Sequence, residues 1–251
     1  MSLDIYKKRY IVKYEDINAN ARFKETTIGL IAQQVSAEHA QLLNMGYNEL
    51  QLLNKAWMMS RVVFEIYHSP KPNEEILIET WIEKTDRIHS YRNCHFYDNE
   101  NKIFAAAQTA WIVVDTVKKD IDDVRNYVTN FPHIPNICVI KHSPDRIKPF
   151  TAKPQHVYTK HVDFSSLDLL GHVNNMKYVE WFIDGLPNNL QFEKQIELLS
   201  INYIYEVFNN DILKYEYICN QEQGSTIVSC NVISEQSDRC VVTINSQLKA
   251  I

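Results

Sequence analysis

The stretch VDFSSLDLLGHVNNMKYVEWF, residues 162–182, decides the fold, because an earlier part of the chain repeats its pattern. At an offset of 150 residues and without gaps, VKYEDINANARF (12–23) lies against VDFSSLDLLGHV (162–173). Apolar and aromatic residues match in the pairs Val12/Val162, Tyr14/Phe164 and Ile17/Leu167. The similarity is weak, but the order of polar and apolar positions indicates a duplicated unit.

Each copy is followed by the same order of elements. In the first, apolar residues recur at three- and four-residue steps over 26–46, typical of one long amphipathic helix that ends near Gly46. In the second, a shorter helical segment ends at Gly185 and Pro187. Runs rich in β-branched and aromatic residues follow both helices and indicate antiparallel strands. The sequence therefore predicts an α+β protein in which a sheet with a helix on one face occurs twice.

A proline-rich connection separates the two copies. Five of the eight prolines lie between residues 131 and 154, and proline opposes both helix and central strand. We expect an N-terminal unit over 1–130, a linker over 131–156 and a C-terminal unit over 157–251. The linker is basic, with Lys141, Arg146, Lys148 and Lys153 against Asp145 alone over 139–153, and an ordinary exposed loop is the simplest reading of this charge.

Composition narrows the class of protein. The chain has 251 residues, 45% hydrophobic and 23% charged, and its net charge of −5 gives no reason to expect binding to nucleic acid. No stretch has the length of a signal-peptide core or of a membrane span. Five widely spaced cysteines without a CxxC pair indicate neither a disulfide framework nor a zinc site, so we expect a reduced, cytoplasmic protein without metal or cofactor.

Only the second copy carries a polar cluster before its helix. His172 is the side chain best suited to proton transfer near neutral pH, and Asp168 is close enough in sequence to orient its imidazole or to position a water. Asn174 and Asn175 are good helix caps, and the free N–H groups of a helix start favour a carbonyl that gains negative charge. The matching residues of the first copy are different: Asn18 for Asp168, Ala21 for Gly171 and Arg22 for His172. The alternative is a well-capped helix with an incidental histidine.

A second acid stands out in SINYIYEVF, residues 200–208. If this stretch is a strand, alternation places Asn202, Ile204 and Glu206 on one face. A glutamate in an otherwise apolar and aromatic strand lies at an exposed edge or is held for chemistry, because a buried acid is costly unless it is paired. The residues alone leave both interpretations open.

DLLGHVNNMKYVEW followed by ELLSINYIYEV resembles the second half of the acyl-acyl-carrier-protein thioesterases, enzymes that release free fatty acids. AWMMSR, ETW and WIVVD are similar to stretches of the first half of that family, in matching order. The resemblance spans nearly the whole chain. It implies a tandem hotdog fold, in which a curved antiparallel sheet wraps a long helix twice over, and hydrolysis of acyl thioesters carried by acyl carrier protein.

The resemblance also implies roles for residues. His172 falls at the catalytic histidine of the family, Asp168 at its supporting aspartate, and Glu206 at the acid proposed to activate water. Two positions depart from the pattern: Leu170 stands where the family typically has asparagine, and Val207 stands where plant members have a cysteine. Val207 excludes a thiolate nucleophile at that position, so we expect hydrolysis by an activated water.

The residues Gly171, Val173 and Asn174 are expected to position the substrate, with backbone amides near 171–174 stabilising the oxyanion. Leu170 cannot donate the hydrogen bond that an asparagine would supply. Either Asn174 takes over this role or the activity is low.

By resemblance, the acyl chain lies in the first unit, against the 26–50 helix and the stretch WMMSRVVF. The candidate pocket residues are Trp57, Met58, Met59 and Phe64, although plain core packing explains any one of them as well. An acidic carrier protein needs a local basic patch on this acidic chain. The candidates are the 139–153 connection and the run Lys7, Lys8 and Arg9.

Two other functions stay open on the sequence: an acyl-CoA thioesterase of the same fold, and a weakly active acyl-binding protein, which Leu170 makes conceivable. A hotdog dehydratase fits the order of the polar residues less well. A homodimer also stays open, although duplication within one chain already supplies two units.

Overall fold

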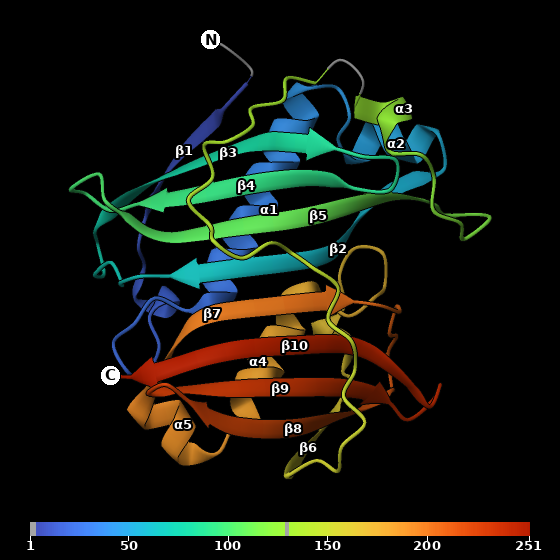
Figure 1. The fold of residues 1–251 in the computed structure, drawn as a ribbon. Helices are drawn as coiled ribbons and strands as arrows, with labels where there is room; N and C mark the ends of the chain where they lie inside the picture. The colour runs from blue at the N-terminus through green and yellow to red at the C-terminus, as the bar shows by residue number, and fades with distance from the viewer. Residues whose placement is uncertain (1–3, 129–130) are drawn as a thin grey trace. The chain divides into compact units, whose positions relative to one another are not determined.

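The structure is a computed structural model that describes residues 4–128 and 131–251. The chain divides into two compact units, Met1–Pro144 and Asp145–Ile251, and the division falls inside the predicted linker. Each unit is an antiparallel sheet with a long helix against one face (Figure 1). This confirms the predicted α+β class and the repeated helix-plus-sheet plan.

In the first unit the strands have the order β1-β3-β4-β5-β2, with every neighbouring pair antiparallel. Helix α1 packs on the sheet through Ile28, Ile31 and Val35. The elements are β1 (Tyr6–Ile11), α1 (Glu25–Leu42), α2 (Tyr47–Leu52), β2 (Lys55–Ile66), β3 (Glu75–Thr85), β4 (Ser90–Tyr97), β5 (Ile103–Asp115) and α3 (Arg125–Val128), with a 3-10 turn η1 (Tyr14–Asp16). The single helix predicted over 26–46 ends earlier, at Leu42, because the chain turns at Asn44 with φ 58°, and a separate helix follows Gly46.

The second unit repeats this arrangement with the strand order β7-β10-β9-β8-β6, again all antiparallel. Helix α4 buries Trp181 and Phe182, and Phe182 stacks on Tyr217 of the sheet with 5.7 Å between ring centroids. The elements are β6 (His156–His161), η2 (Phe164–Ser166), α4 (Asn175–Asp184), α5 (Asn188–Glu193), β7 (Lys194–Tyr203), β8 (Ile212–Glu222), β9 (Ser225–Ser234) and β10 (Arg239–Ala250). Each strand of the first unit thus has a counterpart in the second.

The segment 131–155 is held against the sheets, on the face of each that is turned away from its helix (Figure 1). In the first unit the buried Glu65 carboxylate accepts from the backbone N–H of Lys141 (2.8 Å) and of His142 (3.1 Å), and it contacts His142 Nδ1 at 2.7 Å. In the second unit Asn202 accepts from Ile147 N–H (2.6 Å). The basic side chains of the connection are exposed, as an exposed loop predicts, but its backbone is bound by buried side chains of both sheets.

Candidate active site

The polar cluster before α4 is a tight loop. The Asp168 N–H donates to the His172 carbonyl (2.7 Å), and the Gly171 N–H donates to the Asp168 carbonyl (3.0 Å). Asp168 Oδ1 accepts from the N–H of Leu170 (2.8 Å) and of His172 (3.2 Å). Gly171 has φ +79°, a backbone conformation that glycine adopts without strain. The side chain of Asp168 and the freedom of Gly171 therefore shape the loop that presents His172.

Glu206 lies in the connection between β7 and β8, and the prediction that it is part of a strand is wrong. Strand β7 ends at Tyr203. The N–H groups of Ile204 and Tyr205 both point to one carbonyl, that of Val241 (2.8 and 3.3 Å), so the regular ladder cannot continue. The Val207 carbonyl then accepts from the Val173 N–H (2.9 Å) and ties the connection to the loop before α4.

This tie brings His172 and Glu206 together. His172 Nε2 lies 3.5 Å from Glu206 Oε2, and the two side chains are 13% and 27% exposed. The imidazole also meets the ring of Phe208 edge-to-face, with 5.1 Å between centroids. The pair is therefore partly sheltered yet open to water, which is what an acid–base couple that uses a water molecule requires.

Asp168 binds the loop backbone through its carboxylate, so its support of His172 passes through the loop; its role in the reaction stays a prediction. The first unit contains the same loop. There, Asn18 Oδ1 accepts from the N–H of Asn20 (3.0 Å) and of Arg22 (3.1 Å), the places that match Leu170 and His172. Since a neutral asparagine does the same work in the first unit, shaping this loop does not need the negative charge of Asp168.

The backbone amides of 171–174 are not free to bind an oxyanion, which corrects the expectation for Gly171 and Val173. All four already donate within the loop region: Gly171 N–H to the Asp168 carbonyl, His172 N–H to Asp168 Oδ1, Val173 N–H to the Val207 carbonyl and Asn174 N–H to the Ser166 carbonyl. Asn174 caps α4 as predicted, because its Oδ1 accepts from the Met176 N–H (2.9 Å). The cap uses only the Oδ1 atom of Asn174, so its side-chain NH2 can still donate a hydrogen bond.

The start of α4 is fixed from the sheet as well. The Tyr203 hydroxyl donates to the Asn175 carbonyl (3.1 Å). Burial raises the pKa of Tyr203 well above its usual value, so the hydroxyl keeps its proton and stays a donor at any physiological pH. Strand β7 therefore holds the helix start, and the connection that leaves this strand carries Glu206.

The candidate acyl-pocket residues all lie on β2. Met59 and Phe64 are buried and Met58 is half-buried. Trp57 has a packing role, because its indole N–H donates to the Met45 carbonyl (3.0 Å) and its ring packs on a buried cluster formed by Val113, Val124 and Val128. An acyl site formed by these four residues stays a prediction.

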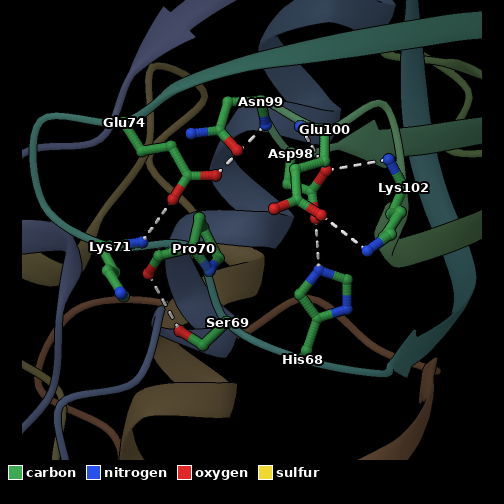
Figure 2. Close-up of polar contacts among 9 residues, drawn as sticks. All are labelled: His68, Ser69, Pro70, Lys71, Glu74, Asp98, Asn99, Glu100 and Lys102. Carbon is green, nitrogen blue, oxygen red and sulfur yellow. Dashed lines mark hydrogen bonds and ion pairs between the residues drawn. The ribbon is translucent and has the colours of Figure 1, made fainter.

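The first unit has different chemistry at the place of the His172–Glu206 pair. The N–H groups of Tyr67 and His68 both donate to the Phe104 carbonyl (2.8 and 3.3 Å), as those of Ile204 and Tyr205 do to the Val241 carbonyl. Ser69 therefore takes the place of Glu206, and the neighbouring His68 takes that of Tyr205. Figure 2 shows the His68 imidazole directed at Asp98, with 2.8 Å between Nε2 and Oδ2. The sequence comparison missed this pair, because the gap-free offset that matches the loops does not extend to the strands.

Within residues 4–128 and 131–251, no group of three or more histidine, cysteine, aspartate or glutamate side chains could hold a metal ion. Among the helices of the same residues, none combines the length and the apolar character needed to cross a membrane.

Two units of this kind in one chain define a tandem hotdog protein, and solved structures share the architecture. An acyl-ACP thioesterase from Bacteroides thetaiotaomicron superposes with a TM-score of 0.86 at 23% identity, covering 99% of this chain and 100% of that one. A 12:0-ACP thioesterase from Umbellularia californica gives 0.88 at 14% identity, covering 98% and 94%. Residues 3–131 match the model of the acyl-ACP thioesterase N-terminal domain, and residues 151–249 match that of the C-terminal domain. The chain belongs to the acyl-ACP thioesterase family.

Curated relatives are plant enzymes. An oleoyl-acyl carrier protein thioesterase of Coriandrum sativum is 24% identical over 224 residues, 83% of this chain and 61% of the relative. Oleoyl-acyl carrier protein thioesterase 1 of Arabidopsis thaliana is 23% identical over 237 residues, 88% of this chain and 66% of the relative. The chain thus spans just under two thirds of the length of these relatives. A MaoC-like dehydratase also shares the fold, with a TM-score of 0.63 at 6% identity, so the fold alone does not set the reaction.

Proposed function

We propose that this chain hydrolyses the thioester of fatty acyl-acyl carrier protein and releases free fatty acid and carrier protein. The observation that supports the reaction most directly is the His172–Glu206 pair, 3.5 Å apart and partly accessible, in the unit that matches the C-terminal domain of the family. The relatives named above as acyl carrier protein thioesterases support the substrate.

In the proposed mechanism, Glu206 with His172 takes a proton from a water molecule, whose oxygen attacks the thioester carbonyl carbon. The carbonyl oxygen becomes an oxyanion, for which the side-chain NH2 of Asn174 is the available donor. The C–S bond then breaks, and the proton passes to the sulfur of the leaving pantetheine thiol. The present separation of 3.5 Å is long for a hydrogen bond, and such contacts often shorten when substrate binds.

The residues Asp168, Gly171 and Val173 are positioning residues in this proposal. Asp168 and Gly171 set the loop that carries His172, and the Val173 N–H holds the connection that carries Glu206. We also propose that the chain works in the cytoplasm, which its five free cysteines support.

The test is free-thiol release from acyl carrier protein and acyl-CoA thioesters of several chain lengths, by wild type, His172→Ala and Glu206→Gln. Both variants should lose about 10² to 10⁴ in rate, because general acid–base groups contribute that much. Glu180→Gln is the matched control, since Glu180 is an exposed acid of α4 paired with Lys177. If wild type hydrolyses acyl-CoA as fast as acyl-acyl carrier protein, the alternative function of an acyl-CoA thioesterase is favoured.

An acyl-binding protein with little activity is the second candidate, and the bonded amides of 171–174 together with Leu170 favour it. If the protein only binds acyl chains, wild type, His172→Ala and Glu206→Gln should be equally slow on every substrate, and fatty acid should be found bound to the purified protein.

A further inference from the structure

We propose that the segment 145–153 is the docking surface for the acidic carrier protein, through a basic strip formed by Arg146, Lys148 and Lys153. This inference rests on the proposed function, because it concerns the carrier-linked substrate. The sequence offers two basic runs, the 139–153 connection and Lys7, Lys8 and Arg9. The choice between them follows from which cations form salt bridges with acidic side chains in the structure.

The cations of the basic strip are exposed and unpaired. Within the part of the chain that the structure describes, Arg146, Lys148 and Lys153 form no salt bridge, and Asp145 is the one acid of the segment. The rival run differs, because each of its cations already contacts a glutamate of its own unit: Lys7 with Glu79, Lys8 with Glu38 and Arg9 with Glu75. A paired cation has its field largely cancelled, so the strip offers the stronger attraction to an acidic surface.

The backbone beneath the strip is fixed. Asn202 accepts from the Ile147 N–H (2.6 Å) and donates to the Asp145 carbonyl (3.0 Å). Asn231 donates to the Phe150 carbonyl (2.9 Å). Both asparagines are buried, at 5% and 4% exposed. A charged segment held in this way loses little conformational freedom when a partner binds, which favours its use as a docking surface.

The strip lies in the same unit as His172 and Glu206, and Asn202, which binds its backbone, belongs to the strand that leads to Glu206. Asn202 binds the backbone of Asp145 and Ile147. It is four residues before Glu206, so the Cα atoms of Asn202 and Glu206 are at most about 14 Å apart. A carrier protein delivers its thioester on a long flexible arm, so its docking surface can lie on the same unit as the proposed catalytic pair without touching it. Because the whole chain carries a net charge of −5, an acidic carrier would otherwise be repelled, and a local patch of unpaired cations is needed.

The experiment compares two triple variants: Arg146→Gln/Lys148→Gln/Lys153→Gln and the equal-charge control Lys7→Gln/Lys8→Gln/Arg9→Gln. Each is assayed at low and high salt on acyl-acyl carrier protein and on the same acyl chain as the uncharged pantetheine thioester. For the strip variant we expect KM for the carrier-linked substrate to rise about tenfold or more at low salt, with kcat unchanged. High salt should shrink this difference, and the pantetheine thioester should show none.

The outcomes separate the two proposals. If wild type hydrolyses the carrier-linked substrate but the strip variant matches it at low salt, the docking surface lies elsewhere and the inference fails. A larger loss in the control variant would place docking on β1. If both substrates are slow for the strip variant, the substitutions have damaged the fold, and the single variants Arg146→Gln and Lys153→Gln decide. If wild type hydrolyses neither substrate, the proposed function itself fails.

Discussion

The side chain of Asp168 shapes the loop that carries His172. Its Oδ1 accepts from two backbone N–H groups, and Asn18 makes the same two bonds in the first unit. We therefore expect Asp168→Asn to keep the free energy of unfolding within about 0.5 kcal/mol of wild type. Asp168→Ala should lower it by about 0.5–2 kcal/mol, as for other side chains that cap backbone N–H groups.

Urea unfolding and the hydrolysis rate check this together. Because the asparagine variant keeps the loop, it should keep its activity within about tenfold, and the alanine variant should be the slower of the two. A large loss of rate in Asp168→Asn with unchanged stability would show instead that the charge of the carboxylate acts on His172.

Leu170 is the second residue for which the duplication gives a prediction. Asn20 occupies the matching place in the first unit, so the loop accepts an asparagine there. Since the nearby backbone amides are occupied, Leu170→Asn adds a second side-chain donor to that of Asn174. We expect kcat to rise by about tenfold or more, because an oxyanion donor contributes about 10² to 10³.

The matched control for this change is Leu169→Asn, which makes the same substitution one position earlier, on a side chain that is 80% exposed. Steady-state kinetics on one carrier-linked substrate distinguishes the two variants. Equal kcat values for Leu170→Asn, Leu169→Asn and wild type would mean that position 170 does not face the oxyanion.

At the scale of elements, the interdomain connection is bound through Glu65 of β2. Burial raises the pKa of the Glu65 carboxyl, but hydrogen bonds from His142, from Tyr67 and from two backbone N–H groups outweigh burial and bring the pKa below its usual 4.5. A carboxyl whose pKa is lower in the folded state contributes stability above pH 4.5, and this contribution is lost as the pH falls below that value.

We therefore expect the 131–144 segment to become sensitive to an acid-active protease as the pH falls below about 4.5. Glu65→Gln keeps one oxygen that can accept from the two backbone N–H groups but loses the charge and the oxygen that accepts from the Tyr67 hydroxyl, so it should weaken the connection at neutral pH by about 0.5–1.5 kcal/mol and should remove this pH dependence. Glu222→Gln, on an exposed side chain, is the control. Identical cleavage of wild type and Glu65→Gln at every pH would contradict this role.

At the scale of the whole molecule, the duplicated scaffold carries two different polar sites. The second unit pairs His172 with Glu206, whereas at the matching places the first unit has Arg22 and Ser69, next to a His68 that is engaged by Asp98. Asp98 is itself held by the backbone N–H groups of Glu100 and Lys102 (Figure 2). The first-unit histidine is thus fixed in a structural contact.

We expect one catalytic site per chain. Arg22→Ala and His68→Ala should stay within about threefold of the wild-type kcat, while His172→Ala should lose about 10² to 10⁴. The same carrier-linked assay measures all three. A comparable collapse in His68→Ala, in a variant that still melts cooperatively, would show that the first unit also takes part in the reaction.

The sequence by itself determined the duplication, the α+β class and the position of the polar loop before α4. These features depend on local patterns: the three- and four-residue apolar period of α1, the alternation of the strands, and the cap Asn174. The family resemblance also identified His172 and Glu206, which the fold then brought to 3.5 Å.

Only the tertiary structure decided how these residues are used. Strand β7 ends at Tyr203 because two N–H groups converge on the Val241 carbonyl, and the Val173–Val207 bond then sets Glu206 beside His172. The amides of 171–174 and the backbone of 145–150 are bound by groups far away in the chain or by side chains folded back on it. Such hydrogen bonds have no sequence period, because any segment that folding brings within reach can supply the partner.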